Sequence, residues 1–157
     1  IKEHISIELI KELHKIVFKN SKEFAGELRK KGEEVVVKDG IGNIVHMGAP
    51  QSRVISLLNE LVDWYNKNKQ KYPALVLASV IHNQFENIHP FRDGNGRVGR
   101  LLLNNILLKN GLPPLNIDFK NRREYYQSLQ EYQKNHNLRL TIDLMLKEYK
   151  NLKKLKD

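Results

Sequence analysis

The segment from residue 88 to residue 100 holds the side chains best suited to chemistry. It reads Ile-His-Pro-Phe-Arg-Asp-Gly-Asn-Gly-Arg-Val-Gly-Arg and leads directly into an apolar stretch. Its glycines allow successive backbone N–H groups to turn inward and bind an anion. Arg97 and Arg100 share one face of the first helical turn, where the helix dipole disfavours cations unless they meet a polyanion. We therefore expect a phosphate ligand.

Two further side chains of this segment predict a reaction at phosphorus. Asp93 offers a carboxylate oxygen of the kind that holds Mg²⁺ together with nucleotide phosphates. His89, with an unperturbed pKa of about 6.5, can take a proton from a hydroxyl at neutral pH. Together they indicate in-line attack of a hydroxyl on a nucleoside triphosphate. The chain contains no Gly-x-x-x-x-Gly-Lys-Ser/Thr pattern, so a P-loop enzyme is excluded.

The composition limits the setting of this chemistry. The 157 residues are 40% hydrophobic, enough for one core, so we expect one domain over residues 1–157. The absence of cysteine excludes disulfide scaffolds, thiolate catalysis and Cys-based metal sites. No uncharged apolar run is long enough to span a bilayer, and we expect a cytoplasmic protein without a membrane partner. Because residue 1 is Ile, we expect the sequence to be a piece of a longer protein.

The net positive charge is weaker evidence of function than the segment 88–100. Lys and Arg total 27 against 18 Asp and Glu, a difference of +9, but much of it is diffuse lysine. The Lys-rich segment 147–157 is typical of a solvated helical tail. Three of the eight arginines lie at positions 92, 97 and 100, in the segment with the chemistry, rather than on a basic patch. A basic nucleic-acid-binding module is the alternative from another class; DNA binding that survives His89→Ala and Arg100→Ala would support it.

Hydrophobic periodicity predicts the elements that position this segment. A short β-hairpin is expected over 35–45, around a Gly-rich turn. Helices are expected over 6–20, from 52 to at least 65, over 74–88, 98–109, 121–134 and 139–152. The stretch 98–109 is apolar nearly all round and is expected at the centre of the core. The fold class is thus an all-α bundle with one projecting hairpin.

The string from His89 to Arg100 resembles the signature of the Fic (filamentation induced by cAMP) domain, His-x-Phe-x-Asp/Glu-Gly-Asn-Gly-Arg-x-x-Arg, at every defined position. The resemblance implies transfer of AMP from ATP to a Ser, Thr or Tyr hydroxyl of a target protein. It implies His89 as the base, Asp93 as the ligand of Mg²⁺ (or Mn²⁺), and contacts of Arg97 and Arg100 with the phosphates. The phosphate cradle would comprise Gly94, Asn95 and Gly96.

The same resemblance implies roles outside the signature. Tyr125, Tyr126 and Gln133 would border the nucleoside. Adjacent tyrosines cannot both face one side of a helix, so at least one is expected to be structural. The hairpin would act as a flap that aligns the target by strand pairing. The flap residues are Val36, Val37, Ile44, Val45 and His46. A homodimer is a further expectation.

Some alternatives stay open within the family. Doc-type relatives that phosphorylate carry Lys at the position of Gly96, so AMP transfer is favoured here, but the motif does not separate transfer from removal of AMP. Many Fic proteins have an inhibitory Ser/Thr-x-x-x-Glu-Gly/Asn helix. The string Ser56–Glu60 is followed by Leu61 and is typical of a core helix, so we expect the inhibitory element in flanking sequence or on a partner.

His82 can be interpreted either as a structural core residue or as a metal ligand. It lies on an apolar stripe of the helix over 74–88, which favours a hydrogen-bonded core histidine. A metal site made by His82, His89 and Asp93, and with it a metallohydrolase, is the weaker interpretation.

Overall fold

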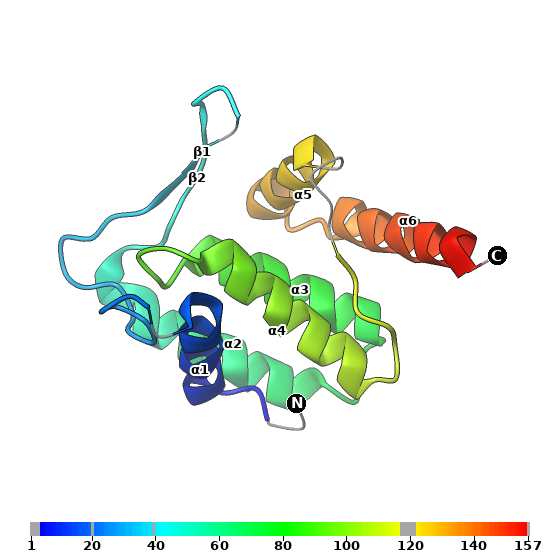
Figure 1. The fold of residues 1–157 in the computed structure, drawn as a ribbon, viewed down its shortest axis with the longest axis horizontal. Helices are drawn as coiled ribbons and strands as arrows, with labels where there is room; N and C mark the ends of the chain where they lie inside the picture. Colours follow the sequence, from blue (N-terminus) through cyan, green and yellow to red (C-terminus); the bar gives the residue numbers. More distant parts are fainter. Residues whose placement is uncertain (1–3, 20, 39, 117–121, 157) are drawn as a thin grey trace.

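The structure is a computed structural model that describes residues 4–19, 21–38, 40–116 and 122–156. Within these ranges it contains six α-helices and one antiparallel β-hairpin (Figure 1). The elements are α1 (Ile7–Phe18), β1 (Val36–Lys38), β2 (Ile44–Met47), a 3-10 turn (Gln51–Arg53), α2 (Val54–Asn68), α3 (Ala74–Ile88), α4 (Asn95–Lys109), α5 (Arg122–Asn135) and α6 (Arg139–Lys156). The predicted helical fold with one hairpin is confirmed. In the described part of the chain, no helix is both long and apolar enough to cross a membrane.

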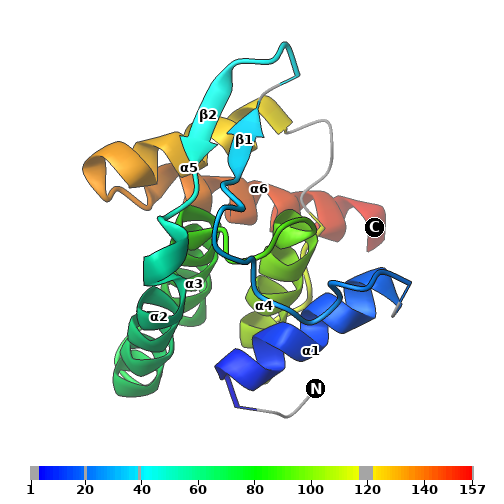
Figure 2. The same ribbon diagram turned by 90° about the vertical axis from the view of Figure 1, so that its left-hand side faces the viewer.

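The core forms around α3, which packs against α2, α4, α5 and α6. Figures 1 and 2 show α3 and α4 side by side, with α1 on the far side of α4 from α3. The expectation that the stretch 98–109 is central is therefore only partly right. Val98 and Leu102 are completely buried, but Leu101 is 39% exposed and Leu108 is 53% exposed. These two leucines point outward because α4 packs mainly on α1 and α3.

The beginning of α4 differs from the prediction in a way that affects the site. The apolar pattern predicts a helix from residue 98, yet α4 begins at Asn95, with Gly94 as its N-cap at φ 82°. A pattern of apolar residues cannot show the first turn here because that turn is polar and lines a cavity. Arg97 therefore lies in the first turn, as expected, whereas Arg100 lies in the second.

The hairpin stands away from the helices and contacts α5 through β2 (Figure 2). Its register pairs Val37 with His46 and Lys38 with Ile44, with an irregularity between the two pairs. In Figure 1 the hairpin lies above the start of α4, and α5 lies on the same side of the molecule as the hairpin. At the other end of the chain, α6 continues through Lys156, so the Lys-rich segment is helical as far as it is described.

Candidate active site

A cavity of about 420 Å³ lies between the hairpin, the α3–α4 loop and α5. Its walls are residues 35–38, Glu86, His89, residues 92–97, Arg100, Tyr125, Tyr126 and Leu129. Seven residues singled out from the signature meet here: His89, Asp93, Gly94, Asn95, Gly96, Arg97 and Arg100. The motif thus corresponds to one concave site rather than to a surface loop.

His89 terminates α3 in the left-handed region, with φ 52° and ψ 62°. Its N–H donates to the Phe85 carbonyl at 2.9 Å. Burial above all lowers the pKa of His89 to about 4; the nearby His46 and Arg29 act in the same direction and the Glu86 carbonyl opposes them. The imidazole is therefore neutral at pH 7. Because Nδ1 is buried, Nε2 is the nitrogen available to the cavity.

The side chain of Asn95 stabilises the loop between α3 and α4. The amide is 2% exposed, donates to the Phe91 carbonyl at 2.7 Å and accepts from the Phe91 N–H at 2.8 Å. That pair of bonds closes the turn between α3 and α4. The first N–H groups of a helix have no partner within the helix. The backbone N–H groups of Asn95, Gly96 and Arg97, at the start of α4, are therefore available to bind an anion.

Gly94 and Gly96 are needed for different reasons. A Cβ at Gly94 would lie 2.7 Å from Cε2 of Phe18, and its φ of +82° disfavours any other residue. A Cβ at Gly96 would meet only the flexible tip of Arg100, at 3.4 Å. Gly94 is therefore required by the fold, whereas a methyl group at Gly96, which lines the cavity, would not disturb the core.

We expect Gly94→Ala to destabilise the protein and Gly96→Ala to weaken ATP binding without destabilising it. The cost at Gly94 is about 1–3 kcal/mol of unfolding free energy, since the strained backbone and the clash add. Thermal unfolding and calorimetric titration of both variants with ATP separate the two effects. A Gly96→Ala variant that binds ATP as tightly as the wild type would contradict the assignment of Gly96 to the phosphate-binding site.

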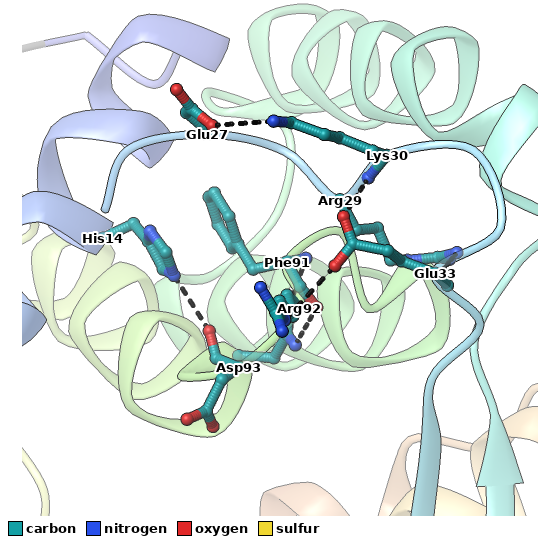
Figure 3. Close-up of polar contacts among 9 residues, drawn as sticks. His14, Glu27, Arg29, Lys30, Glu33, Phe91, Arg92 and Asp93 are labelled. Atoms are coloured by element: carbon teal, nitrogen blue, oxygen red, sulfur yellow. Dashed lines mark hydrogen bonds and ion pairs between the residues drawn. The ribbon is translucent and has the colours of Figure 1, made fainter. Parts of the chain in front are cut away.

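The three arginines of the segment differ in their surroundings. Arg97 is exposed and its guanidinium lies 4.9 Å from the centre of the Phe18 ring. Arg100 is half-buried in the cavity wall. Arg92 forms an ion pair with Glu33 at 3.3 Å (Figure 3). Because Glu33 partly neutralises Arg92, the excess positive charge on this side of the cavity comes from Arg97 and Arg100.

His14 holds Asp93 in place through the backbone. The N–H of Gly26 donates to Nδ1 of His14 at 2.8 Å, so the ring proton is on Nε2, which donates to the Asp93 carbonyl at 2.8 Å. Phe91 stacks on the same imidazole with ring centres 3.9 Å apart. His14 is completely buried. Its partners lie far away along the chain, so no local sequence pattern indicates this role.

The Asp93 carboxylate points away from His14 (Figure 3) and lies on the cavity wall. One oxygen, Oδ1, accepts the Gly94 N–H at 2.7 Å. The residue is exposed, so its other oxygen can reach a ligand. One accessible carboxylate beside an anion cradle fits Mg²⁺, which is commonly held by one carboxylate and nucleotide phosphates. Among the described residues, no three His, Asp or Glu side chains gather into a metal site made by protein alone.

His82 is a core histidine, as its apolar stripe predicts. It is completely buried, its Nδ1 donates to the Gly99 carbonyl at 3.1 Å, and its Nε2 accepts from the Tyr125 hydroxyl at 2.7 Å. Burial lowers the pKa of His82 to about 4. Both ring nitrogens are thus engaged, which argues against a metal site with His89.

The predicted nucleoside residues separate into two groups. Tyr125 and Tyr126 both line the main cavity, although adjacent positions on a helix were expected to diverge. Tyr125 has the structural role, through its bond with His82. Gln133 is exposed and lines a smaller pocket beside the main cavity, together with His46 and Glu86.

The residues predicted to form a flap lie on the hairpin. Val36 is 41% exposed and Ile44 60% exposed, and Val36 and Val37 also line the cavity. Val45 belongs to β2, but its side chain lies outside the described part. His46 turns inward: its Nε2 donates to the Asn87 carbonyl at 2.9 Å, and its ring centre lies 6.3 Å from that of His89.

Glu86 is a functional candidate that the sequence reasoning missed. It is 6% exposed, borders both the main cavity and the smaller pocket, and its Oε1 has no hydrogen-bond partner. Burial raises the pKa of Glu86 to about 7, against the opposing charge of Arg100. Helical spacing could have indicated Glu86, because residues 82, 86 and 89 are titratable and their spacing places them on one side of α3 and its C-terminal end.

We expect ATP binding to take up a proton at Glu86. Phosphates bring negative charge into the cavity and raise the pKa of this carboxyl further, so the bound state holds more protons than the free state. Affinity for ATP should therefore fall as the pH rises above 7, by up to about tenfold per unit. Calorimetry of the wild type and of Glu86→Gln, in buffers of different ionisation enthalpy, measures this uptake. An identical pH dependence in both proteins would contradict it.

Comparisons with known proteins match most of the chain to one family. A sequence model of the Fic/DOC family matches residues 4–107. The protein adenylyltransferase fic-1 of Caenorhabditis briggsae is 36% identical over 132 residues, which are 82% of this chain and 24% of that protein. A probable protein adenylyltransferase of Aquifex aeolicus is 45% identical over 82 residues, 52% of this chain and 25% of that protein. The chain thus spans about a quarter of the length of these relatives.

Solved structures show the same fold. The structure of Fic-1 residues 134–508 from Caenorhabditis elegans superposes with a TM-score of 0.76 at 30% identity, covering 98% of this chain and 46% of that one. A Fic domain-containing signalling protein from Bacteroides thetaiotaomicron gives a TM-score of 0.74 at 26% identity, covering 91% and 53% of the two chains.

Proposed function

We propose that this chain, which belongs to the Fic/DOC family, transfers AMP from ATP to a hydroxyl group of a target protein. The observation that carries the proposal is the single cavity in which a neutral histidine, an accessible carboxylate, two arginines and a helix N-terminus converge. The names of the relatives, protein adenylyltransferases, support the same reaction.

In this proposal His89 is the general base. Its Nε2 takes the proton of the target hydroxyl as the oxygen attacks the α-phosphorus of ATP. The bond to the bridging oxygen breaks, and pyrophosphate leaves. The lowered pKa of His89 keeps the nitrogen unprotonated at neutral pH, so no prior deprotonation is needed.

The residues around His89 hold the nucleotide. Backbone N–H groups at the start of α4 bind phosphate oxygens, and Arg97 and Arg100 balance their charge. Asp93 would hold Mg²⁺, which neutralises charge on the phosphates when it is bound. Tyr126 and Gln133 would border the nucleoside, and Tyr125 would support that wall through His82.

The hairpin offers a docking edge for the target. Among the described residues each strand pairs only with the other, so its outer edge has no strand partner, and the hairpin carries exposed apolar side chains. An extended target segment can add to such an edge by main-chain hydrogen bonds, which presents its hydroxyl to His89.

We place the inhibitory element outside this chain or on a partner. The string Ser56–Glu60 lies within α2, and Leu58 at its centre is completely buried. Glu60 lines a different cavity, between α2, α3 and α5, rather than the one that holds Arg100.

Peptide mass spectrometry tests the proposal. The chain is incubated with ATP, Mg²⁺ and a protein lysate, beside its His89→Ala variant. AMP on Ser, Thr or Tyr residues is expected in the first sample only. Equal AMP modification in both samples, or none in either despite measurable ATP binding, would overturn the proposal.

A further inference from the structure

Arg29 is a buried arginine whose partners are backbone carbonyl groups. It lies between α1 and β1 and is 2% exposed. Its guanidinium donates to the carbonyls of His89 at 2.8 Å, Ile88 at 3.2 Å and Glu33 at 3.2 Å, and also to that of Ala49. A charge that is buried in this way needs hydrogen-bond partners, which these four backbone carbonyls supply.

Two of these contacts, together with one from the Arg29 backbone, fix the turn that carries His89. The Arg29 side chain binds the carbonyls of residues 88 and 89, and its backbone N–H donates to the Pro90 carbonyl at 3.0 Å. Arg29 thus holds three successive carbonyls. Among them is His89 itself, whose left-handed backbone is unfavourable for a residue with a Cβ. That backbone conformation aims the imidazole at the cavity.

The guanidinium contact with the Ala49 carbonyl reaches the base of the hairpin. Ala49 follows β2 by two residues and donates its own N–H to the Ile88 carbonyl at 3.2 Å. Its neighbour Gly48 is packed closely here, because a Cβ at that position would lie 3.1 Å from Cβ of His89 and 3.2 Å from Nη2 of Arg29. The guanidinium therefore joins the hairpin base to the turn at His89 with no intervening side chain.

We propose that Arg29 is a positioning residue for His89, which fixes the orientation of the imidazole and ties it to the base of the hairpin where the target docks. The proposal rests on the proposed function, in which His89 is the base. Arg29 also acts on the imidazole through its charge, which helps to lower the pKa of His89.

The test compares Arg29→Met and Arg29→Lys with the wild type, and uses Arg53→Met as the control because Arg53 is exposed. AMP transfer, ATP affinity by calorimetry and the pKa of His89 by NMR titration are measured. In Arg29→Met we expect kcat to fall about a hundredfold, the ATP dissociation constant to stay within about twofold of the wild type, and the pKa of His89 to rise. Arg29→Lys keeps the charge but not the fork of donors. It should therefore retain most of the pKa shift while its kcat is still reduced.

Two results of the activity measurements would overturn the proposal. One is a loss of activity that only follows the unfolded fraction, measured by circular dichroism, with the pKa of His89 unchanged in the folded fraction. The other is a kcat in Arg29→Lys equal to that of the wild type. If Arg29→Met does not fold, Arg29→Lys carries the test. If the wild type transfers no AMP, the proposed function fails, but the positioning role of Arg29 can still be tested. Hydrogen exchange of the His89 and Ala49 N–H groups is then compared between Arg29→Lys and the wild type. Faster exchange in Arg29→Lys is expected, and unchanged exchange would contradict the role of Arg29 in fixing this turn.

Discussion

Replacement of His89 by Ala should reduce AMP transfer about a thousandfold while leaving ATP bound. The effect is this large because proton removal by a positioned base contributes roughly two to four orders of magnitude. The imidazole lies on the cavity wall and is neutral at pH 7, since its pKa is about 4, so in our proposal it accepts the hydroxyl proton. Its ring is separate from the start of α4, where we propose that the phosphates bind. Transfer is followed with labelled ATP and binding by calorimetry.

The His46→Ala variant is a matched control for this result. His46 lies next to His89, with ring centres 6.3 Å apart, and its Nε2 is engaged with the Asn87 carbonyl. Removal of His46 should change the rate far less than removal of His89. A His89→Ala variant with more than a tenth of the wild-type rate, or one that no longer binds ATP although it is folded, would contradict the role of base.

Replacement of Arg100 by Ala should weaken both ATP binding and AMP transfer. Arg100 is half-buried in the cavity wall, where a guanidinium can make charge-assisted hydrogen bonds to a phosphate group. Loss of such a contact costs about 1.5–3 kcal/mol, which corresponds to roughly tenfold to a hundredfold in the dissociation constant. Arg100→Lys should recover only part of this, because an ammonium group lacks the planar fork of donors.

The control for Arg100 is Arg123→Ala, which removes an exposed arginine at the start of α5. Both variants lower the net charge by one, so a general electrostatic effect changes both equally. Equal loss of ATP affinity in the two proteins, at matched salt concentration, would show that Arg100 has no specific contact with the phosphates.

The sequence predicts most of the helices because their signals are local. Ser6 caps α1 with its side chain at 3.0 Å from the Leu9 N–H, and Pro73 and Pro90 bracket α3 at residues 74–88. The start of α4 was missed for a physical reason. Asn95 and Gly96 carry no apolar signal, and the turn before them is held by the amide of Asn95 rather than by a hydrophobic pattern.

The sequence also places the residues from His89 to Arg100 in one site because they are contiguous. The residues that hold this segment from outside were not predicted, since their partners lie far away along the chain. His14 binds the carbonyl of a residue 79 positions away, and Arg29 binds one 60 positions away. A lone arginine in a polar, Gly-broken segment carries no periodicity, and nothing short of a structure shows that it is buried.

The most direct test of AMP transfer follows the α-phosphate and the γ-phosphate of ATP separately. The chain is incubated with Mg²⁺ and target lysate, once with ATP labelled at the α-phosphate and once with ATP labelled at the γ-phosphate. We predict protein-bound label from the α-phosphate alone, and only when His89 is present. Label from the γ-phosphate in protein would instead show phosphoryl transfer and contradict the assignment of the reaction.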